Sequence, residues 1–144
     1  EMTVDYFQNW NLIGVPFESN SFPCQGYVEG SLYSFENGSY MNELVDNMST
    51  GSGYWLRFDE AGTCTYSGEP INELTITLNE GWNLISGIST SITLSDIQDP
   101  DGIIISGTIY EFAPDGYSNA EILEPGTGYW VRANSSGSIF LINN

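Results

Sequence analysis

The side chains of this sequence that could bind a ligand are concentrated in two motifs, each of which is written twice. The first motif reads NWNLIG at Asn9–Gly14 and GWNLIS at Gly81–Ser86, and the second reads GYWLR at Gly53–Arg57 and GYWVR at Gly128–Arg132. They hold every tryptophan and every basic residue of the chain, which are Trp10, Trp55, Trp82, Trp130, Arg57 and Arg132. An exposed indole is a flat stacking surface for a sugar, and a guanidinium donates hydrogen bonds to hydroxyls. The motifs are therefore candidate binding elements as well as candidate structural ones.

The GYW motif also has a structural interpretation, because successive side chains of a strand point to opposite faces. Tyr54 is then expected to enter the core, while Trp55 and Arg57 share the other face. The second copy repeats this pattern with Tyr129 inward and with Trp130 and Arg132 outward. We expect the tryptophans to lie across a seam in a common interior of two units. Each arginine is expected over an indole or beside a carboxylate, at about 0.5–2 kcal/mol for a cation–π contact.

The alternative interpretation of these residues is a sugar-binding site at Trp55, Arg57, Trp130 and Arg132. Further aromatic side chains could contribute, namely Tyr27, Tyr40, Tyr66 and Tyr117. A coplanar, solvent-facing pair of tryptophan rings would favour this interpretation. In the first motif, Asn11 and Asn83 are predicted to be half-buried amides that satisfy nearby backbone groups instead of binding a ligand.

Composition excludes several classes of function. The 144 residues include 19 acidic and 2 basic side chains and no histidine, for a net charge of −17. Nucleic-acid binding needs clustered Lys and Arg, so it is not expected, and neither is attachment to an anionic membrane. No apolar run is long enough for a membrane helix, so no membrane insertion is expected. The absence of His and Lys removes Ser–His, Cys–His and Schiff-base catalysis.

The remaining candidates for chemistry are acidic residues and cysteines. Asp59 and Glu60 form an adjacent acidic pair, but adjacent strand residues point apart, so a polysaccharide hydrolase is only a third hypothesis and no enzymatic activity is expected. Asp99 and Asp101 are weak calcium candidates, because turn chemistry alone explains Asp–Gly sequences. No cofactor or metal is expected. Cys24 and Cys64 are predicted to form a disulfide in a secreted protein, with two buried thiols as the alternative.

Aligning the two copies predicts the fold. Apolar and polar residues alternate along Met2–Tyr6 and its counterpart, as in half-buried strands, and each is predicted to form a hairpin with the following WNLI strand. Turn signals then recur every eight to twelve residues, and a helix over Tyr40–Met48 is rejected because the second copy favours a strand there. The prediction is an all-β chain of two tandem, similar β-sandwich or small-barrel units, each with about five to six short antiparallel strands. The units are placed at 1–69 and 70–144.

The order GWNLIS, Tyr-x-Phe and PGTGYWVR resembles a tandem β repeat module of bacterial secreted and cell-surface proteins, which is mostly uncharacterised. The resemblance implies an extracellular location and an adhesive or structural role, and it implies no catalytic residues.

Our main functional hypothesis is therefore a non-enzymatic extracellular structural or adhesive protein, with a self-assembling subunit of a surface filament or layer as its specific form. Its expected partners are further copies of itself or neighbouring surface-protein modules. Edge pairing through Glu1–Tyr6 and Ser138–Ile142 would join such subunits. The rival hypothesis is a carbohydrate-binding module that uses exposed Trp and Tyr, with glycans as partners.

Overall fold

The computed structural model describes residues 1–19 and 21–143, and it confirms the all-β prediction. The first half contains β1 (Met2–Tyr6), β2 (Asn9–Ile13), β3 (Phe17–Glu18), β4 (Tyr33–Glu36), β5 (Ser39–Asn42), β6 (Tyr54–Phe58), β7 (Gly62–Tyr66) and β8 (Glu69–Pro70). The second half contains β9 (Glu73–Leu78), β10 (Gly81–Ser86), β11 (Ile92–Thr93), β12 (Tyr110–Ala113), β13 (Gly116–Asn119), β14 (Ile122–Leu123), β15 (Gly128–Ala133) and β16 (Gly137–Ile142). The only helical elements among these residues are two 3-10 turns, η1 (Val45–Asn47) and η2 (Leu94–Asp96). Within the described chain, no helix is long and apolar enough to cross a bilayer.

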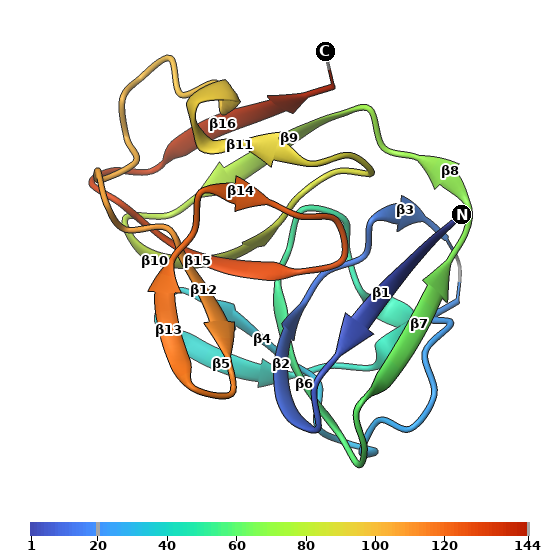
Figure 1. The fold of residues 1–144 in the computed structure, drawn as a ribbon. Coiled ribbons are helices and arrows are strands. Elements are labelled where there is room, and N and C mark those ends of the chain that lie inside the picture. The colour runs from blue at the N-terminus through green and yellow to red at the C-terminus, as the bar shows by residue number, and fades with distance from the viewer. Residues whose placement is uncertain (20, 144) are drawn as a thin grey trace.

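The two halves repeat one arrangement of sheets, which confirms the predicted duplication (Figure 1). Each half has a four-stranded antiparallel sheet, in the order β2-β6-β4-β5 or β10-β15-β12-β13. Each half also has a two-stranded antiparallel ribbon, β1–β7 or β9–β16. The described strands form several small sheets and no closed barrel. The structure does not test the boundary predicted at residue 69, which falls within β8.

The predicted hairpin between the first two strands of each half is wrong. β1 pairs with β7, and β2 pairs with β6 in a different sheet. The cause is a sharp corner between the strands, where Asn9 has φ 74° and its counterpart Gly81 has φ 95°. Left-handed backbone of this kind turns the chain away from its partner, so consecutive strands enter different layers.

The buried amide of Asn11 holds this corner together. Its Oδ1 accepts the Phe7 N–H at 3.0 Å, and its Nδ2 donates to the Phe7 carbonyl at 2.8 Å. Asn83 makes the same two bonds to Asn79, both at 2.9 Å. Each asparagine therefore satisfies backbone groups that a hairpin ladder would otherwise pair.

Each half has its own hydrophobic core, so the expected common interior is wrong. The first core contains Tyr6, Ile13, Phe17, Leu32, Tyr54, Leu56, Phe58, Tyr66 and the two cysteines. The second core is mainly aliphatic and contains Ile76, Leu78, Ile85, Ile88, Leu123, Val131, Ile139, Leu141 and their neighbours. No tryptophan belongs to either core. The Cys24–Cys64 disulfide is confirmed and lies buried in the first core.

The halves interlock at a seam with reciprocal contacts. The end of β2 bridges to the turn before β15 through Ile13 and Thr127, and the end of β10 bridges to the turn before β6 through Ile85 and Ser52. Gly14 donates its N–H to Gly126 at 3.2 Å, and the equivalent Ser86 donates to the equivalent Gly51 at 3.0 Å. Corresponding residues of the two copies thus make corresponding contacts, as expected for two units related by an approximate twofold axis.

A buried tyrosine pair also joins the first core to this seam. The Tyr6 hydroxyl donates to the Gly126 carbonyl at 2.7 Å. The Tyr66 hydroxyl is hydrogen-bonded to the Tyr6 hydroxyl at 2.7 Å. Burial is the main cause of the raised pKa of both residues: the pKa of Tyr66 rises to about 12, and that of Tyr6 lies well above its usual value.

We expect the free energy of unfolding to fall as pH rises from about 10 to about 12. Unfolded tyrosine ionises near pH 10, whereas the folded state keeps the protons of Tyr6 and Tyr66 to higher pH. The unfolded state therefore binds fewer protons in this range, and stability contributed by the buried pair is lost with rising pH. Urea unfolding at pH 8 to 12 measures this loss, and Tyr6→Phe should make it shallower. A curve that stays flat to pH 12 would contradict the expectation.

Candidate functional site

Ten aromatic side chains form one surface across the seam, which we call the aromatic face. They line two hollows: the first is lined by Phe35, Trp82, Tyr110, Tyr117 and Trp130, and the second by Trp10, Tyr33, Tyr40, Trp55 and Phe112. The hollows have volumes of about 450 Å³ and 390 Å³, which lie within the usual range of roughly 300–1,000 Å³ for small-molecule sites. All the residues that line the two hollows in the described part of the chain are aromatic.

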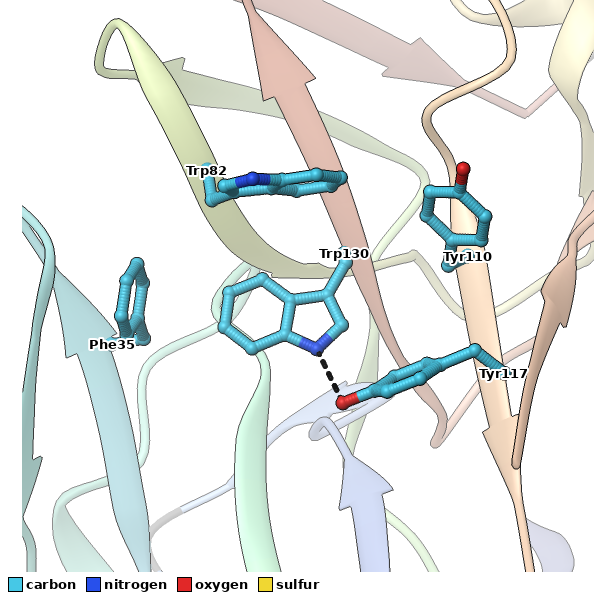
Figure 2. Close-up of a pocket in the computed structure, with 5 residues that line it drawn as sticks. All are labelled: Phe35, Trp82, Tyr110, Tyr117 and Trp130. Carbon is cyan, nitrogen blue, oxygen red and sulfur yellow. Dashed lines mark hydrogen bonds between the residues drawn. The ribbon is translucent and has the colours of Figure 1, made fainter. Parts of the chain in front are cut away.

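In the first hollow, neighbouring rings stand nearly at right angles to a central ring, Trp130. We call a hollow with this arrangement a box. Figure 2 shows the face of Trp130 surrounded by the other four rings, with Trp82 and Phe35 nearly edge-on. The plane of Trp130 makes angles of 85° with Trp82 and 78° with Phe35. The indole N–H of Trp130 donates to the Tyr117 hydroxyl at 3.3 Å. Partial desolvation by the neighbouring rings raises the pKa of the largely exposed Tyr117 further above neutral pH, so its hydroxyl stays a neutral hydrogen-bonding group.

The second hollow repeats the first with the roles of the halves exchanged. Trp55 stands at 90° to Trp10 and at 80° to Phe112, which comes from the second half. In the first hollow, the reciprocal contribution is Phe35 from β4 of the first half, with its ring centroid 4.9 Å from that of Trp130. Each half therefore completes the other's hollow, and neither half could form a complete one alone.

The GYW strands place the rings by the alternation expected from the sequence. On β6, Tyr54, Leu56 and Phe58 are buried, whereas Trp55 is half-buried and Arg57 exposed. The inward Tyr54 hydroxyl accepts the Ser49 N–H at 2.8 Å. On β15, the inward Tyr129 accepts the Glu124 N–H at 2.7 Å in the same way. The inward tyrosines thus hold β6 and β15 in one orientation. Because side chains alternate along a strand, Trp55 and Trp130 are then directed outward.

The two arginines lie on the aromatic face beside the boxes. Arg132 is the cross-strand partner of Trp82, and Arg57 is the cross-strand partner of Trp10. Directly opposed residues point to the same side of a sheet with Cβ atoms about 5 Å apart. Both guanidinium groups are exposed, and neither has a carboxylate ion-pair partner within residues 1–19 and 21–143. The expected pairing with a crowded carboxylate is thus not found in the described chain.

Several residues of this site could not be singled out from the motifs alone. Trp10 and Trp82, first interpreted as structural, are 38% and 41% exposed. The prediction from the sequence does not include Tyr33, Phe35, Tyr110 and Phe112 as binding residues, although the repeated Tyr-x-Phe spacing is a usable signal. Of the other tyrosines considered for sugar binding, Tyr40 and Tyr117 line the hollows, whereas Tyr66 is buried and Tyr27 packs against Phe22 at the first core.

The acidic candidates take part in local structure. The carboxylate of Asp99 accepts the N–H groups of Ile103 at 3.0 Å and Ile104 at 2.9 Å, so turn formation accounts for it. Asp101 is exposed, and no cluster of three potential metal ligands occurs in the described part of the chain. Asp59 and Glu60 follow β6 and line neither hollow.

The terminal strands differ in how much of their edge is occupied. β16 pairs with β9 on one side, and on the other side Phe140 exchanges two backbone bonds with Gln98, each of 2.9 Å. β1 pairs with β7, and no second strand pairs with it among the described residues. Edge pairing between subunits stays a prediction, for which β1 offers the freer edge.

No family model, curated protein or solved structure matches this chain. Function must therefore be argued from the site itself, and the resemblance to bacterial surface repeats stays a prediction.

Proposed function

We propose that this chain is a non-enzymatic adhesive module of an extracellular protein and that it attaches to its target through the aromatic face. One observation carries the proposal: ten aromatic residues line two hollows outside both cores, and four of these side chains, Trp10, Tyr40, Trp82 and Tyr117, are exposed. Exposed aromatic clusters of this kind typically mark binding surfaces. The disulfide supports an extracellular setting.

The chemistry of the hollows supports binding over catalysis. Their linings contain indoles, phenyl rings and phenols, and no carboxylate, thiol or aliphatic hydroxyl. General acid–base catalysis near neutral pH needs a group that titrates there. The raised pKa of Tyr117 places it further from such a role.

A carbohydrate ligand is the second candidate, and it is favoured by Arg57 and Arg132 beside the exposed indoles. The paired tryptophan rings, however, stand at 90° and 85° to each other instead of being coplanar. Such rings suit a short or projecting group better than a flat polysaccharide surface.

We expect the double variant Trp10→Ala/Trp82→Ala to lose target binding while it stays folded. Both rings lie outside the cores, so their removal should cost about 1–2 kcal/mol each, which leaves the fold intact. The measurement is retention of the labelled chain on an array of glycans and lipid headgroups, with circular dichroism to check folding.

Phe7→Ala is the matched control, because Phe7 is a 47% exposed aromatic residue that lines neither hollow. It should retain every ligand that the unaltered chain binds. Retention that is unchanged in the double tryptophan variant would contradict the proposal.

A further inference from the structure

The geometry of the hollows points to a specific ligand chemistry, and this inference rests on the proposed binding role of the aromatic face. The two hollows are aromatic boxes. Each has a central indole, Trp130 or Trp55, with neighbouring rings at 78–90° to it. Aromatic faces attract cations, Trp most strongly, and cages of several rings are a known solution for quaternary ammonium groups. Such a group needs no hydrogen-bond acceptor, which suits linings built from aromatic residues.

One arginine lies beside each box. Arg132 is opposite Trp82 on the neighbouring strand and two residues after Trp130, so it flanks both indoles of one box. Arg57 flanks Trp10 and Trp55 in the same way. Although the chain has 19 acidic residues, neither arginine is ion-paired within its described part. A planar guanidinium in this state is a ready partner for a phosphate, which it can bind through two hydrogen bonds.

The charges of the chain and of the arginines act against simple ions of either sign. A net charge of −17 opposes the approach of a simple anion to the arginines. Conversely, the arginine beside each box opposes a simple cation. A ligand that carries both charges sets an attraction against each of these penalties.

We propose that each box binds a phosphocholine group, with its trimethylammonium among the aromatic rings and its phosphate on the adjacent arginine. The chain then holds two groups on one face, one beside Arg57 and one beside Arg132. Such an arrangement suits attachment to a surface that displays this group repeatedly, because two linked contacts bind far more strongly than one.

Isothermal titration of the unaltered chain with four soluble probes tests the ligand chemistry. Phosphocholine should bind at two sites per chain. Phosphoethanolamine lacks the methyl groups and 3,3-dimethylbutyl phosphate lacks the positive charge, so each should bind about tenfold more weakly. Choline, which lacks the phosphate, tests the arginines. Equal affinity for phosphocholine and either phosphate analogue would overturn the proposal.

Variants of the chain separate the two parts of the site. Arg57→Gln/Arg132→Gln should weaken phosphocholine about tenfold and leave choline binding unchanged or stronger, whereas an exposed acidic control, Glu60→Gln, should leave phosphocholine affinity within twofold. Trp82→Ala should reduce the stoichiometry from two to one. Phosphocholine binding that survives the arginine substitutions unaltered would overturn the assignment.

Ligands displayed on vesicles or on a carrier distinguish a lipid source of the phosphocholine group from a glycan or protein source. They also separate failure of the ligand chemistry from failure of the adhesive role. Binding to phosphatidylcholine vesicles would indicate a lipid source, and binding to phosphocholine-conjugated albumin without vesicle binding would indicate a group carried on a glycan or protein; either supports the ligand chemistry. A glycan that needs Trp10 and Trp82 but is not displaced by phosphocholine overturns this inference and leaves the adhesive role standing. Array binding that is unchanged in Trp10→Ala/Trp82→Ala contradicts the adhesive role as well.

Discussion

Replacing Gly14 by alanine is expected to lower the free energy of unfolding by about 3 kcal/mol, the upper part of the usual range for overpacking. A Cβ built on Gly14 would overlap the Cβ of Ser86 and would lie 2.6 Å from its Oγ. Gly14 does not have a positive φ, so the expected cost is steric and not conformational. The overlapped atom is fixed to the backbone, so a rotamer change cannot relieve the contact.

The same contact explains why the two copies of the first motif differ at their last residue. Gly14 and Ser86 occupy equivalent positions, NWNLIG against GWNLIS, and they meet each other at the seam. There is space for one side chain only, and the Ser86 hydroxyl fills it by donating to the Ser52 carbonyl at 2.9 Å. A fully symmetric pair of serines would not fit.

Double variants test this explanation. Gly14→Ser/Ser86→Gly exchanges the two residues and should recover most of the stability that Gly14→Ser loses, a coupling of up to about 3 kcal/mol between the sites. Gly62→Ala is the control, because a Cβ there meets nothing within 4 Å. Urea unfolding measures the unaltered chain, Gly62→Ala, Gly14→Ala and the cycle formed by Gly14→Ser, Ser86→Gly and their double variant. A loss in Gly14→Ala no larger than that in Gly62→Ala would contradict the steric argument.

The sequence predicts local features of this protein well because they depend on short-range patterns. The duplicated motifs and the alternation along Met2–Tyr6 and the GYW strands predict the all-β class, the two similar halves and the inward position of Tyr54 and Tyr129. The Cys24–Cys64 pairing follows from there being only two cysteines.

Features that depend on contacts between distant segments could not be predicted. The first two strands of each half look like a hairpin, but the side chain of Asn11 takes the backbone groups of Phe7 and turns the chain into another layer. The hollows could not be predicted from the sequence for a similar reason, because each is completed by a phenylalanine of the other half, Phe35 or Phe112. Composition favours burial for Trp10 and Trp82, whereas the seam leaves them partly exposed.

Removing the disulfide is expected to have the largest effect on stability. Cys24 and Cys64 are 40 residues apart, and a cross-link that closes a loop of this length stabilises the folded state by about 4 kcal/mol in the chain-entropy model. A domain of this kind has a total stability of about 5–15 kcal/mol, so the loss is a large fraction of the whole. Urea unfolding of Cys24→Ala/Cys64→Ala measures it.

The loss should be concentrated in the first half, because only that half has the cross-link. In the two-stranded ribbon β1–β7, Val4 is paired with Cys64. At the equivalent position of the ribbon β9–β16, Ile76 is paired with Ile139. Ile139 thus stands at the position of Cys64, and the second half has an apolar cross-strand pair there in place of a bridged cysteine. Hydrogen exchange in the variant should therefore show β1 and β7 losing protection before β9 and β16.

A second variant separates the cross-link from the cavity left by the sulfur atoms. Cys24→Ala/Cys64→Val restores apolar volume beside Val4, so it should recover only the packing part of the loss and leave most of the 4 kcal/mol deficit in place. Dithiothreitol should destabilise the unaltered chain and have no effect on either variant. Full recovery in the valine variant would show that packing and not the covalent bridge stabilises the first half. Equal loss of protection in both halves would contradict the expectation that the effect is concentrated in the first half.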